Sequence, residues 1–304
     1  MIASEFYIGQ GLGNQLWVYA VVRTLAEKNG FDFAFLSPQN FKFPELNLDM
    51  GKKVPWRQND VPNSSLSNLF SNYLREERYV NPFGVDISPM DARLLKLADS
   101  TKLDGYFQAE DLIHDNINQI REWVKVPKIM NLDENVCVIS FRGGEYLHHH
   151  QTFLGFHYYQ NAMRLIKEVC PNVKFVVSTD DPEAAEVLIP NAEILSTPTK
   201  SYLDIDQTKV AFDFALLQNA NYLILSNSSF SWWGAWTNSV VKKVIAPKYW
   251  GNFVANNGYW SQGESLTRGW TWLDKSGSDF TYDECKIEFT KFKHSEKYSR
   301  IKLI

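Results

Sequence analysis

The alternation of strand and helix patterns between residues 135 and 250 constrains the fold more than any other feature of the sequence. Short apolar runs typical of buried strands lie at 136–141, 173–177, 192–195, 222–225 and 244–246. Helical patterns separate them around 159–166, from Pro182 onward, over 206–219 and from about Phe230. Strands and helices that alternate with these lengths predict a parallel sheet covered by helices on both faces.

The first 36 residues contain a second unit of the same kind. An apolar run at 6–8 predicts a strand, and the glycine-rich loop 9–14 follows it. Apolar residues then recur at helical spacing over 18–29, and Gly30 is a typical helix end. A further apolar run at 31–36 completes the pattern. The opening therefore predicts a βαβ unit.

The length of 304 residues fits two domains of ordinary size. Five prolines interrupt the stretch from about 40 to 100, which predicts irregular structure with short helices. We expect an α/β fold with an N-terminal domain over 1–130, a second domain over 131–275 and a polar C-terminal tail over 276–304. The two domains are expected to face each other across a cleft.

Chemistry is expected at the ends of the strands in the second domain, because ligands of open α/β sheets bind beyond the carboxyl ends of the strands. Polar residues follow three of these strands. A cation with two glycines follows the first, two carboxylates follow the second, and a hydroxyl-rich turn follows the third. The turns are Ser140–Tyr146, Ser178–Asp181 and Ser226–Gly234. Each turn alone is ordinary, but three in succession favour a binding site.

The residue types of these turns suit a nucleotide diphosphate. Arg142 offers a bidentate fork for phosphate oxygens, and the glycines at 143–144 allow a backbone to approach closely. The turn 228–230 at a helix start presents N–H groups and the positive end of a helix dipole. Asp180 or Asp181 can accept hydrogen bonds from a purine or a ribose. No metal is required for such a site.

Composition argues against several other classes of protein. The net charge of −4 and the pI near 5.9 are unlike those of a general nucleic-acid binder. Three scattered cysteines without a CxxC pair indicate a reducing compartment. No apolar stretch approaches the roughly 20 residues that span a bilayer, and the N-terminus does not resemble a signal peptide. We expect a soluble cytoplasmic protein without an integral membrane segment.

Two other functions stay open on this evidence. The loop 9–13 is close to the dinucleotide fingerprint GxGxxG, although its third glycine comes one residue early. Asp32 lies near the place of a ribose-binding acid, so an NAD-dependent oxidoreductase is one alternative. A non-catalytic glycan-binding protein is the other, since the chain is rich in aromatic residues that suit sugar rings as well as cores. Dinucleotide binding would support the first, and glycan binding without donor turnover the second.

Four motifs resemble those of the bacterial alpha-1,2-fucosyltransferases. The run GLGNQL at 11–16 is similar to that family's N-terminal glycine motif. The run NSSFSWWGAW at 227–236 is similar to its long C-terminal motif and is the most specific match. The runs LDGYFQ at 103–108 and APKYW at 246–250 fit the same family in order and spacing. The resemblance covers roughly residues 6–250.

The resemblance implies a GT-B-type fold with two facing Rossmann-like domains, the first on the acceptor side and the second binding a GDP-sugar. It implies transfer of L-fucose from GDP-fucose, with inversion and without a metal or other cofactor, onto a galactoside. O-antigen or capsule assembly is the implied setting, in the cytoplasm or peripheral to the inner membrane. The expected donor-binding residues are Gly11, Gly13, Asn14, Arg142, Gly143, Asp180, Asp181, Asn227, Ser228, Ser229 and Phe230.

The sequence departs from the family at its hallmark His-x-Arg-Arg-x-Asp. The matching run at 140–145 is Ser-Phe-Arg-Gly-Gly-Glu, so the first arginine is kept as Arg142 and the second is replaced by Gly143. We expect Arg142 to stabilise the charge that builds on the departing GDP. Glu145 and the histidines at 148–150 are the nearest candidates in sequence to take the proton of the acceptor hydroxyl.

A metal site is not expected at either run that suggests one. Adjacent histidines at 148–150 point in different directions, and no carboxylate or thiol stands at ligand spacing nearby. We expect them in a solvated loop or in the lining of the acceptor site. Asp180-Asp181 lacks the spacing of the metal-binding DxD motif of other glycosyltransferases.

Overall fold

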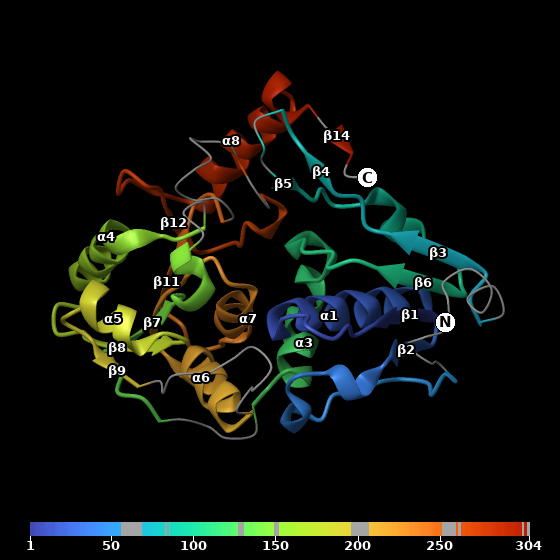
Figure 1. The fold of residues 1–304 in the computed structure, drawn as a ribbon, viewed down its shortest axis with the longest axis horizontal. Helices are drawn as coiled ribbons and strands as arrows, with labels where there is room; N and C mark the ends of the chain where they lie inside the picture. The colour runs from blue at the N-terminus through green and yellow to red at the C-terminus, as the bar shows by residue number, and fades with distance from the viewer. Residues whose placement is uncertain are drawn as a thin grey trace.

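The computed structural model describes residues 1–55, 69–82, 84, 86–126, 131–148, 152–195, 207–250, 260, 263–299 and 301–302. They form two α/β halves that lie side by side, with the N-terminal half on the right of Figure 1 and the C-terminal half on the left. Each half has its own largely parallel sheet. The predicted α/β fold with two Rossmann-like units, as in GT-B enzymes, is confirmed.

The N-terminal sheet has four parallel strands in the order β2-β1-β6-β3. They are β1 (Ile2–Glu5), β2 (Phe33–Leu36), β3 (Asn72–Arg75) and β6 (Thr101–Asp104). Helix α1 (Leu12–Asn29) connects β1 to β2 and ends at Gly30, which adopts the left-handed conformation that glycine tolerates. Thirteen of its eighteen residues are buried, because α1 lies between this sheet and the C-terminal half.

The C-terminal sheet has seven strands in the order β13-β12-β11-β10-β7-β8-β9, and all its pairings are parallel except β12–β13. The strands are β7 (Val136–Phe141), β8 (Lys174–Thr179), β9 (Glu193–Ile194), β10 (Tyr222–Ile224), β11 (Lys243–Pro247), β12 (Thr271–Leu273) and β13 (Asp279–Phe280). The helices are α4 (Gly155–Val169), α5 (Pro182–Leu188), α6 (Gln207–Asn219) and α7 (Ser229–Thr237).

Helices cover both faces of this sheet, and the alternation of side chains along β7 explains how. Cys137, Ile139 and Phe141 pack in one apolar cluster with residues of α4 and α5. Val136 and Val138 point the other way and join the cluster that contains α6 and α7. Because both faces are buried, β7 is a continuous apolar run rather than an alternating one.

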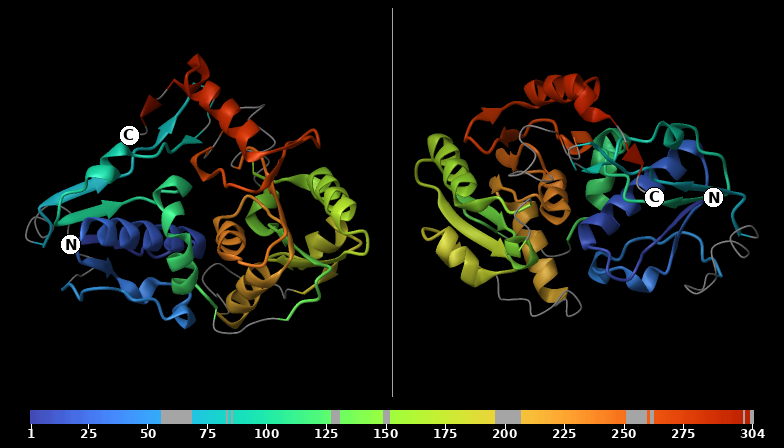
Figure 2. Two further views of the ribbon diagram at one scale, coloured as in Figure 1. Left: turned by 180° about the vertical axis from the view of Figure 1, so that it is seen from behind. Right: turned by 45° about the horizontal axis from the view of Figure 1, so that its top comes forward.

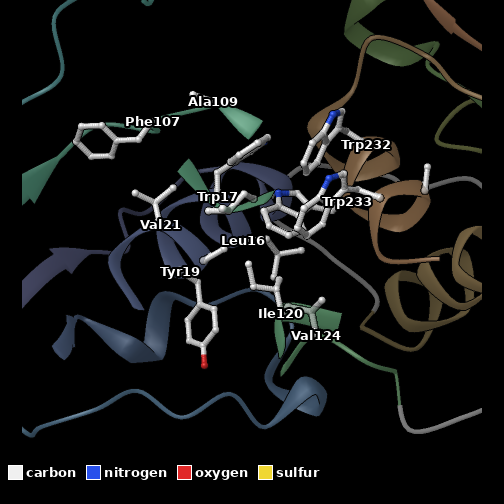
Figure 3. Packing of buried hydrophobic residues seen from close by; sticks show 14 of the residues in the cluster. Leu16, Trp17, Tyr19, Val21, Phe107, Ala109, Ile120, Val124, Trp232 and Trp233 are labelled. Carbon is white, nitrogen blue, oxygen red and sulfur yellow. The ribbon is translucent and has the colours of Figure 1, made fainter. Parts of the chain in front are cut away.

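The two halves are joined by packing of α1 against α7. Trp17 of α1 lies with its ring centroid 4.3 Å from Trp232 and 5.2 Å from Trp233 of α7. Figure 3 shows these rings together, with Leu16 and residues of α3 (Ile117–Trp123) beside them. One continuous apolar cluster therefore runs through both halves. We call the contact between the first turns of α1 and α7, around Gly13 and Ser229, the α1–α7 joint.

The C-terminal segment corrects a prediction. Residues 276–304 were expected only as a polar tail, yet their described part forms β13, α8 (Tyr282–Lys293) and β14 (Ile301–Lys302). Thr281 and Glu284 form a capping box at the start of α8, a signal that is present in the sequence. In Figure 2 α8 crosses above both halves, and β14 pairs with β4 (Tyr79–Val80) next to β5 (Asp86–Ile87).

Most predicted elements of the second half are confirmed, and the first predicted strand is wrong. The strand 136–141 is β7, and the helix expected from about Phe230 is α7. The first strand lies at Ile2–Glu5 rather than at 6–8, where Tyr7 and Ile8 are exposed in the loop that follows. The stretch 40–100, expected to be irregular, also contains β3. The expected junction at 125–134 lies partly outside the described residues, so the domain boundaries stay predictions.

Among the described residues, no helix combines the length and the apolarity that crossing a bilayer requires.

Candidate active site

The three turns singled out in the sequence lie next to one another at the carboxyl ends of β7, β8 and β10. β7 lies between β10 and β8 in the sheet, in parallel register with both. The buried hydroxyls of Ser140, near the end of β7, and of Ser226, just after β10, are 3.2 Å apart. The turns thus share the edge of the sheet at which ligands bind in open α/β folds.

Arg142 is held at this edge by carboxylates. Its Nη1 lies 2.6 Å from Oδ2 of Asp180, and its Nη2 lies 3.8 Å from Oε1 of Glu145. The guanidinium carbon is 5.3 Å from the centre of the Tyr146 ring. The side chain keeps 27% of its surface exposed, so a ligand can still reach it. Asp180 therefore orients a cation that solvent can approach.

Gly143 and Gly144 are explained by contacts within the protein. Their N–H groups donate to Oδ1 of Asp180 and to Oδ2 of Asp181, each at 3.0 Å. A Cβ on Gly143 would lie 2.5 Å from the Asp181 Cβ, and Gly144 has a φ of +45°. The two glycines let the turn after β7 dock against the turn after β8. A close approach to phosphate stays a prediction.

Asp181 has a structural role in the same contact. Its Oδ1 accepts a hydrogen bond from the Ala184 N–H at 3.1 Å, which caps the N-terminus of α5. Both of its carboxylate oxygens are thus bonded to backbone N–H groups. Asp180 is likewise engaged, by Arg142 and Gly143. Hydrogen bonds from either carboxylate to a purine or a ribose stay a prediction.

The α1–α7 joint brings two helix N-termini together. The position of a Cβ on Gly13 lies 2.4 Å from the Phe230 nitrogen, so no larger residue fits there without movement. Oδ1 of Asn14 accepts hydrogen bonds from the Ser229 hydroxyl at 3.0 Å and from the Gln108 amide at 2.8 Å. Gly13 and Asn14, both predicted donor residues, therefore hold the two halves together.

The electrostatics of the joint favour an anion. Among the described residues, no side chain caps α1 at Gly11 or α7 at Ser228, and neither helix has an acidic residue in its first turn. Helix N-termini carry unsatisfied N–H groups and a partial positive charge. Two helix N-termini therefore lie side by side near the edge of the sheet that carries Arg142. Their positive partial charges suit a diphosphate better than a neutral ligand.

The other predicted residues of the long C-terminal motif have packing and anchoring roles. Asn227 is buried and donates from Nδ2 to the Thr152 carbonyl oxygen at 2.7 Å. The carbonyl oxygen of Ser228 accepts from the Trp232 N–H at 2.9 Å in the first turn of α7. Phe230 packs edge-on against Phe214 at 5.4 Å. The motif thus builds the turn that positions the joint.

The candidates for the proton acceptor are only partly placed by the structure. Glu145 is 47% exposed beside Arg142, in the 3-10 turn Gly144–His148. His148 is exposed at the end of that turn, and the histidines at 149 and 150 lie outside the described residues. Within the described ranges, no three His, Cys, Asp or Glu side chains gather as metal ligands.

Two residues of the site, Gln108 and Tyr146, lie in runs that stand out in the sequence but were not among the expected donor-binding residues. Gln108 ends the run 103–108 and bonds Asn14, while its carbonyl oxygen accepts from the Ser265 hydroxyl at 3.2 Å. Tyr146 lies against Arg142. The run LDGYFQ pointed to Gln108, but nothing local in the sequence indicated its partner in α1.

A groove of about 480 Å³ lies elsewhere, between α4 and α5. Its lining includes Met163, Lys167 and Leu188, and none of the predicted site residues. It lies between helices that cover a face of the sheet rather than at the carboxyl ends of the strands, so we do not assign the donor to it.

Comparison with known proteins identifies the family. The profile of glycosyl transferase family 11 matches residues 11–272. This chain therefore belongs to glycosyl transferase family 11 and is a glycosyltransferase. Membership in this family argues against the two alternative functions, an NAD-dependent oxidoreductase and a non-catalytic glycan-binding protein.

Two curated relatives come from Escherichia coli. The alpha-1,2-colitosyltransferase is 31% identical, over 79% of this chain and 89% of the relative. The O-antigen biosynthesis glycosyltransferase WbnK is 26% identical, over 81% of this chain and 94% of the relative. Among solved structures, the fucosyltransferase NodZ from Bradyrhizobium matches with a TM-score of 0.44 and 13% identity, over 81% of this chain and 94% of NodZ.

Proposed function

We propose that the protein transfers L-fucose from GDP-fucose to a hydroxyl of a terminal galactoside, in an α-1,2 linkage. The observation that carries the proposal is an arginine, Arg142, held by Asp180 at the carboxyl edge of the second sheet, together with two helix N-termini that meet at the α1–α7 joint. Support for the linkage comes from the fucosyltransferase-like motifs and from the 31% identical alpha-1,2-colitosyltransferase.

Arg142 is proposed to bind the diphosphate while Asp180 keeps it in place. A guanidinium has five N–H donors in a planar fork, so it can serve a carboxylate and a phosphate at the same time. The guanidinium is held in place by Asp180, whose Oδ2 lies 2.6 Å from Nη1. Asp180 is then a positioning residue, and the helix N-termini of the joint supply further N–H groups to the phosphate oxygens.

The reaction proposed is a single displacement at the anomeric carbon. The acceptor hydroxyl attacks, the bond from that carbon to the β-phosphate oxygen breaks, and the hydroxyl proton leaves to a base. Negative charge grows on the departing GDP, where Arg142 and the two helix N-termini stabilise it. We propose Glu145, which is exposed with its Oε1 3.8 Å from Nη2 of Arg142, as a candidate for this base, beside the histidines at 148–150.

The altered hallmark agrees with the packing of this site. Position 143 lies so close to Asp181 that a side chain there would collide with the turn after β8. The missing cation would have supplied a charge-assisted hydrogen bond of about 1.5–3 kcal/mol. We propose that the joint compensates for it and that the counter-charge of Arg142 makes a metal unnecessary.

Colitose is a second candidate for the donor sugar, because a 31% identical relative is named for its transfer. Colitose is L-fucose without the 3-hydroxyl group, so both sugars fit the same proposed reaction. The name of the second relative supports a role in O-antigen assembly. We propose that the protein acts in the cytoplasm or peripheral to the inner membrane.

A donor panel tests the proposal. GDP-fucose, GDP-colitose, GDP-mannose and a UDP-sugar are each incubated with lactose, with GDP alone as the binding control. We expect tight binding of GDP by calorimetry and a product whose mass and NMR spectrum show fucose on the galactose 2-hydroxyl. Preference for a UDP-sugar would overturn the GDP assignment, and exclusive use of GDP-colitose would replace fucose by its deoxy analogue.

A further inference from the structure

The described part of the chain exposes three aromatic side chains, and they lie in or just after neighbouring strands. Among the described residues, the exposed aromatic side chains are Tyr7, Tyr73 and Tyr106, with 37%, 52% and 37% of their surface exposed. Tyr73 lies in β3, while Tyr7 and Tyr106 follow the ends of β1 and β6. These three strands are neighbours in the N-terminal sheet. The hydroxyls of Tyr7 and Tyr73 both reach Asp104 at the end of β6, and Tyr106 follows Asp104 by two residues.

Asp104, the last residue of β6, connects the hydroxyls of Tyr7 and Tyr73. Its Oδ1 accepts a hydrogen bond from the Tyr7 hydroxyl at 3.1 Å, and its Oδ2 accepts one from the Tyr73 hydroxyl. Burial and the nearby carboxylate raise the pKa of both tyrosines, so their hydroxyls stay protonated and keep donating. Asp104 keeps 22% of its side-chain surface exposed. Each carboxylate oxygen has two lone pairs and can accept a second hydrogen bond.

The base of this cluster is rigid. Behind Asp104 on the same face of the sheet, Lys102 and Glu5 form a buried ion pair of 3.2 Å. Glu76 accepts hydrogen bonds from the backbone N–H groups of Tyr106 at 2.9 Å and of Phe107 at 2.8 Å, which fixes the turn after β6. The tyrosines are thus presented on a preorganised surface, which lowers the entropy lost when a ligand binds.

The cluster lies close to the donor site along the chain. Asp104 is four residues before Gln108, whose side chain bonds Asn14 in the α1–α7 joint. Four residues span at most about 14 Å. Tyr7 is likewise four residues before Gly11, the N-cap of α1. Both segments connect the cluster directly to the α1–α7 joint, which we propose binds the diphosphate.

The chemistry of the cluster suits an uncharged sugar. Aromatic faces are electron-rich and pack against the C–H faces of a pyranose ring, while the carboxylate and the tyrosine hydroxyls bind its hydroxyl groups. Arg75 pairs with Asp104, its Nε lying 3.8 Å from Oδ2, so the cluster carries little net charge with which to attract an anion. We propose that Tyr7, Tyr73, Tyr106 and Asp104 bind the acceptor glycan, an inference that rests on the proposed function and names the residues of its acceptor side.

Steady-state kinetics of two variants test the proposal. Tyr73→Ala removes an exposed ring, and Asp104→Asn removes the charge while keeping the shape. With GDP-fucose and lactose, each should raise the acceptor KM about tenfold or more, the usual effect of losing a hydrogen bond to a charged group, and leave the calorimetric affinity for GDP unchanged. Asp32→Asn is the matched control, because Asp32 is exposed at the amino end of the same sheet. It should change neither value.

A fall in kcat with an unchanged KM would overturn the binding role of Asp104, and wild-type KM values in both variants would overturn the cluster while leaving the proposed function intact. Saturation-transfer NMR makes the test independent of turnover, with lactose, glucosides and N-acetylhexosaminides as probes. Even if the wild type transfers no fucose, loss of sugar signals in Tyr73→Ala would support the cluster. Absence of signals from every sugar in the wild type would overturn it.

Discussion

Replacement of Gly13 by alanine tests the α1–α7 joint most sharply. The added Cβ would lie 2.4 Å from the Phe230 nitrogen and from the Ser229 carbonyl carbon, about 1 Å inside ordinary van der Waals contact. Both are backbone atoms, so α1 and α7 must move apart. Overpacking lowers the unfolding free energy by about 1–3 kcal/mol, and the better helix propensity of alanine offsets about 1 kcal/mol of this loss. Because the clash is with backbone atoms, the upper end of this range applies, and we expect a net loss of about 2 kcal/mol of unfolding free energy together with weaker GDP binding.

Urea denaturation and GDP calorimetry measure the two effects. Gly11→Ala is the control for the stability measurement, because Gly11 has an ordinary φ of −65° and no atom within 4 Å of an added Cβ. It should cost less than about 1 kcal/mol, as an alanine at an N-cap position does. A Gly13→Ala protein with wild-type stability and GDP affinity would refute the close packing of the two helices.

Three further predictions concern the core, the pH dependence and the metal requirement. Trp17→Ala should lower the unfolding free energy by about 3–5 kcal/mol, and a loss below about 1 kcal/mol in urea denaturation would show that the ring does not bridge the halves. Burial raises the pKa of Glu110 above its usual 4.5, despite hydrogen bonds from Trp236 and His114. The folded protein therefore binds this proton more tightly than the unfolded chain, so this stabilisation is present at low pH and lost as pH rises through the raised pKa. Urea denaturation across that pH range should show an unfolding free energy that falls with rising pH in the wild type. The Glu110→Gln variant should lack this contribution. Turnover should persist in excess EDTA, whereas strict dependence on added Mn²⁺ or Mg²⁺ would contradict the metal-free site.

Local patterns in the sequence were sufficient to predict the strands from β7 to β11 and the helices between them, but not β12, β13 or α8. A strand that is buried on both faces, such as β7, is a continuous apolar run and is recognisable alone. The four-residue strands of the first half are different. β6 carries Lys102 and Asp104, whose burial is compatible with a strand only because Glu5 and two tyrosine hydroxyls pair with them. Those partners lie far away in sequence, so no local pattern predicts β6.

The residues of the candidate site were predicted better than their contacts. Arg142 and the turn 228–230 lie at the carboxyl edge of the second sheet, as the strand pattern predicted. The glycines at 143–144 were assigned to phosphate, but the structure shows that the turn after β8 occupies the space beside them. Gly13 similarly faces α7. A glycine in a sequence indicates that something approaches closely, and only the fold shows what it is.

Titration of GDP into Arg142→Ala tests the central claim, that the diphosphate binds at Arg142 beside the α1–α7 joint. Loss of a charge-assisted hydrogen bond of about 1.5–3 kcal/mol should weaken binding roughly 10- to 150-fold. Arg164→Ala is the matched control, because Arg164 is exposed on α4 and pairs with Glu168 outside the site. We expect the control to bind GDP like the wild type. Equal GDP affinity in Arg142→Ala and the wild type would contradict the account.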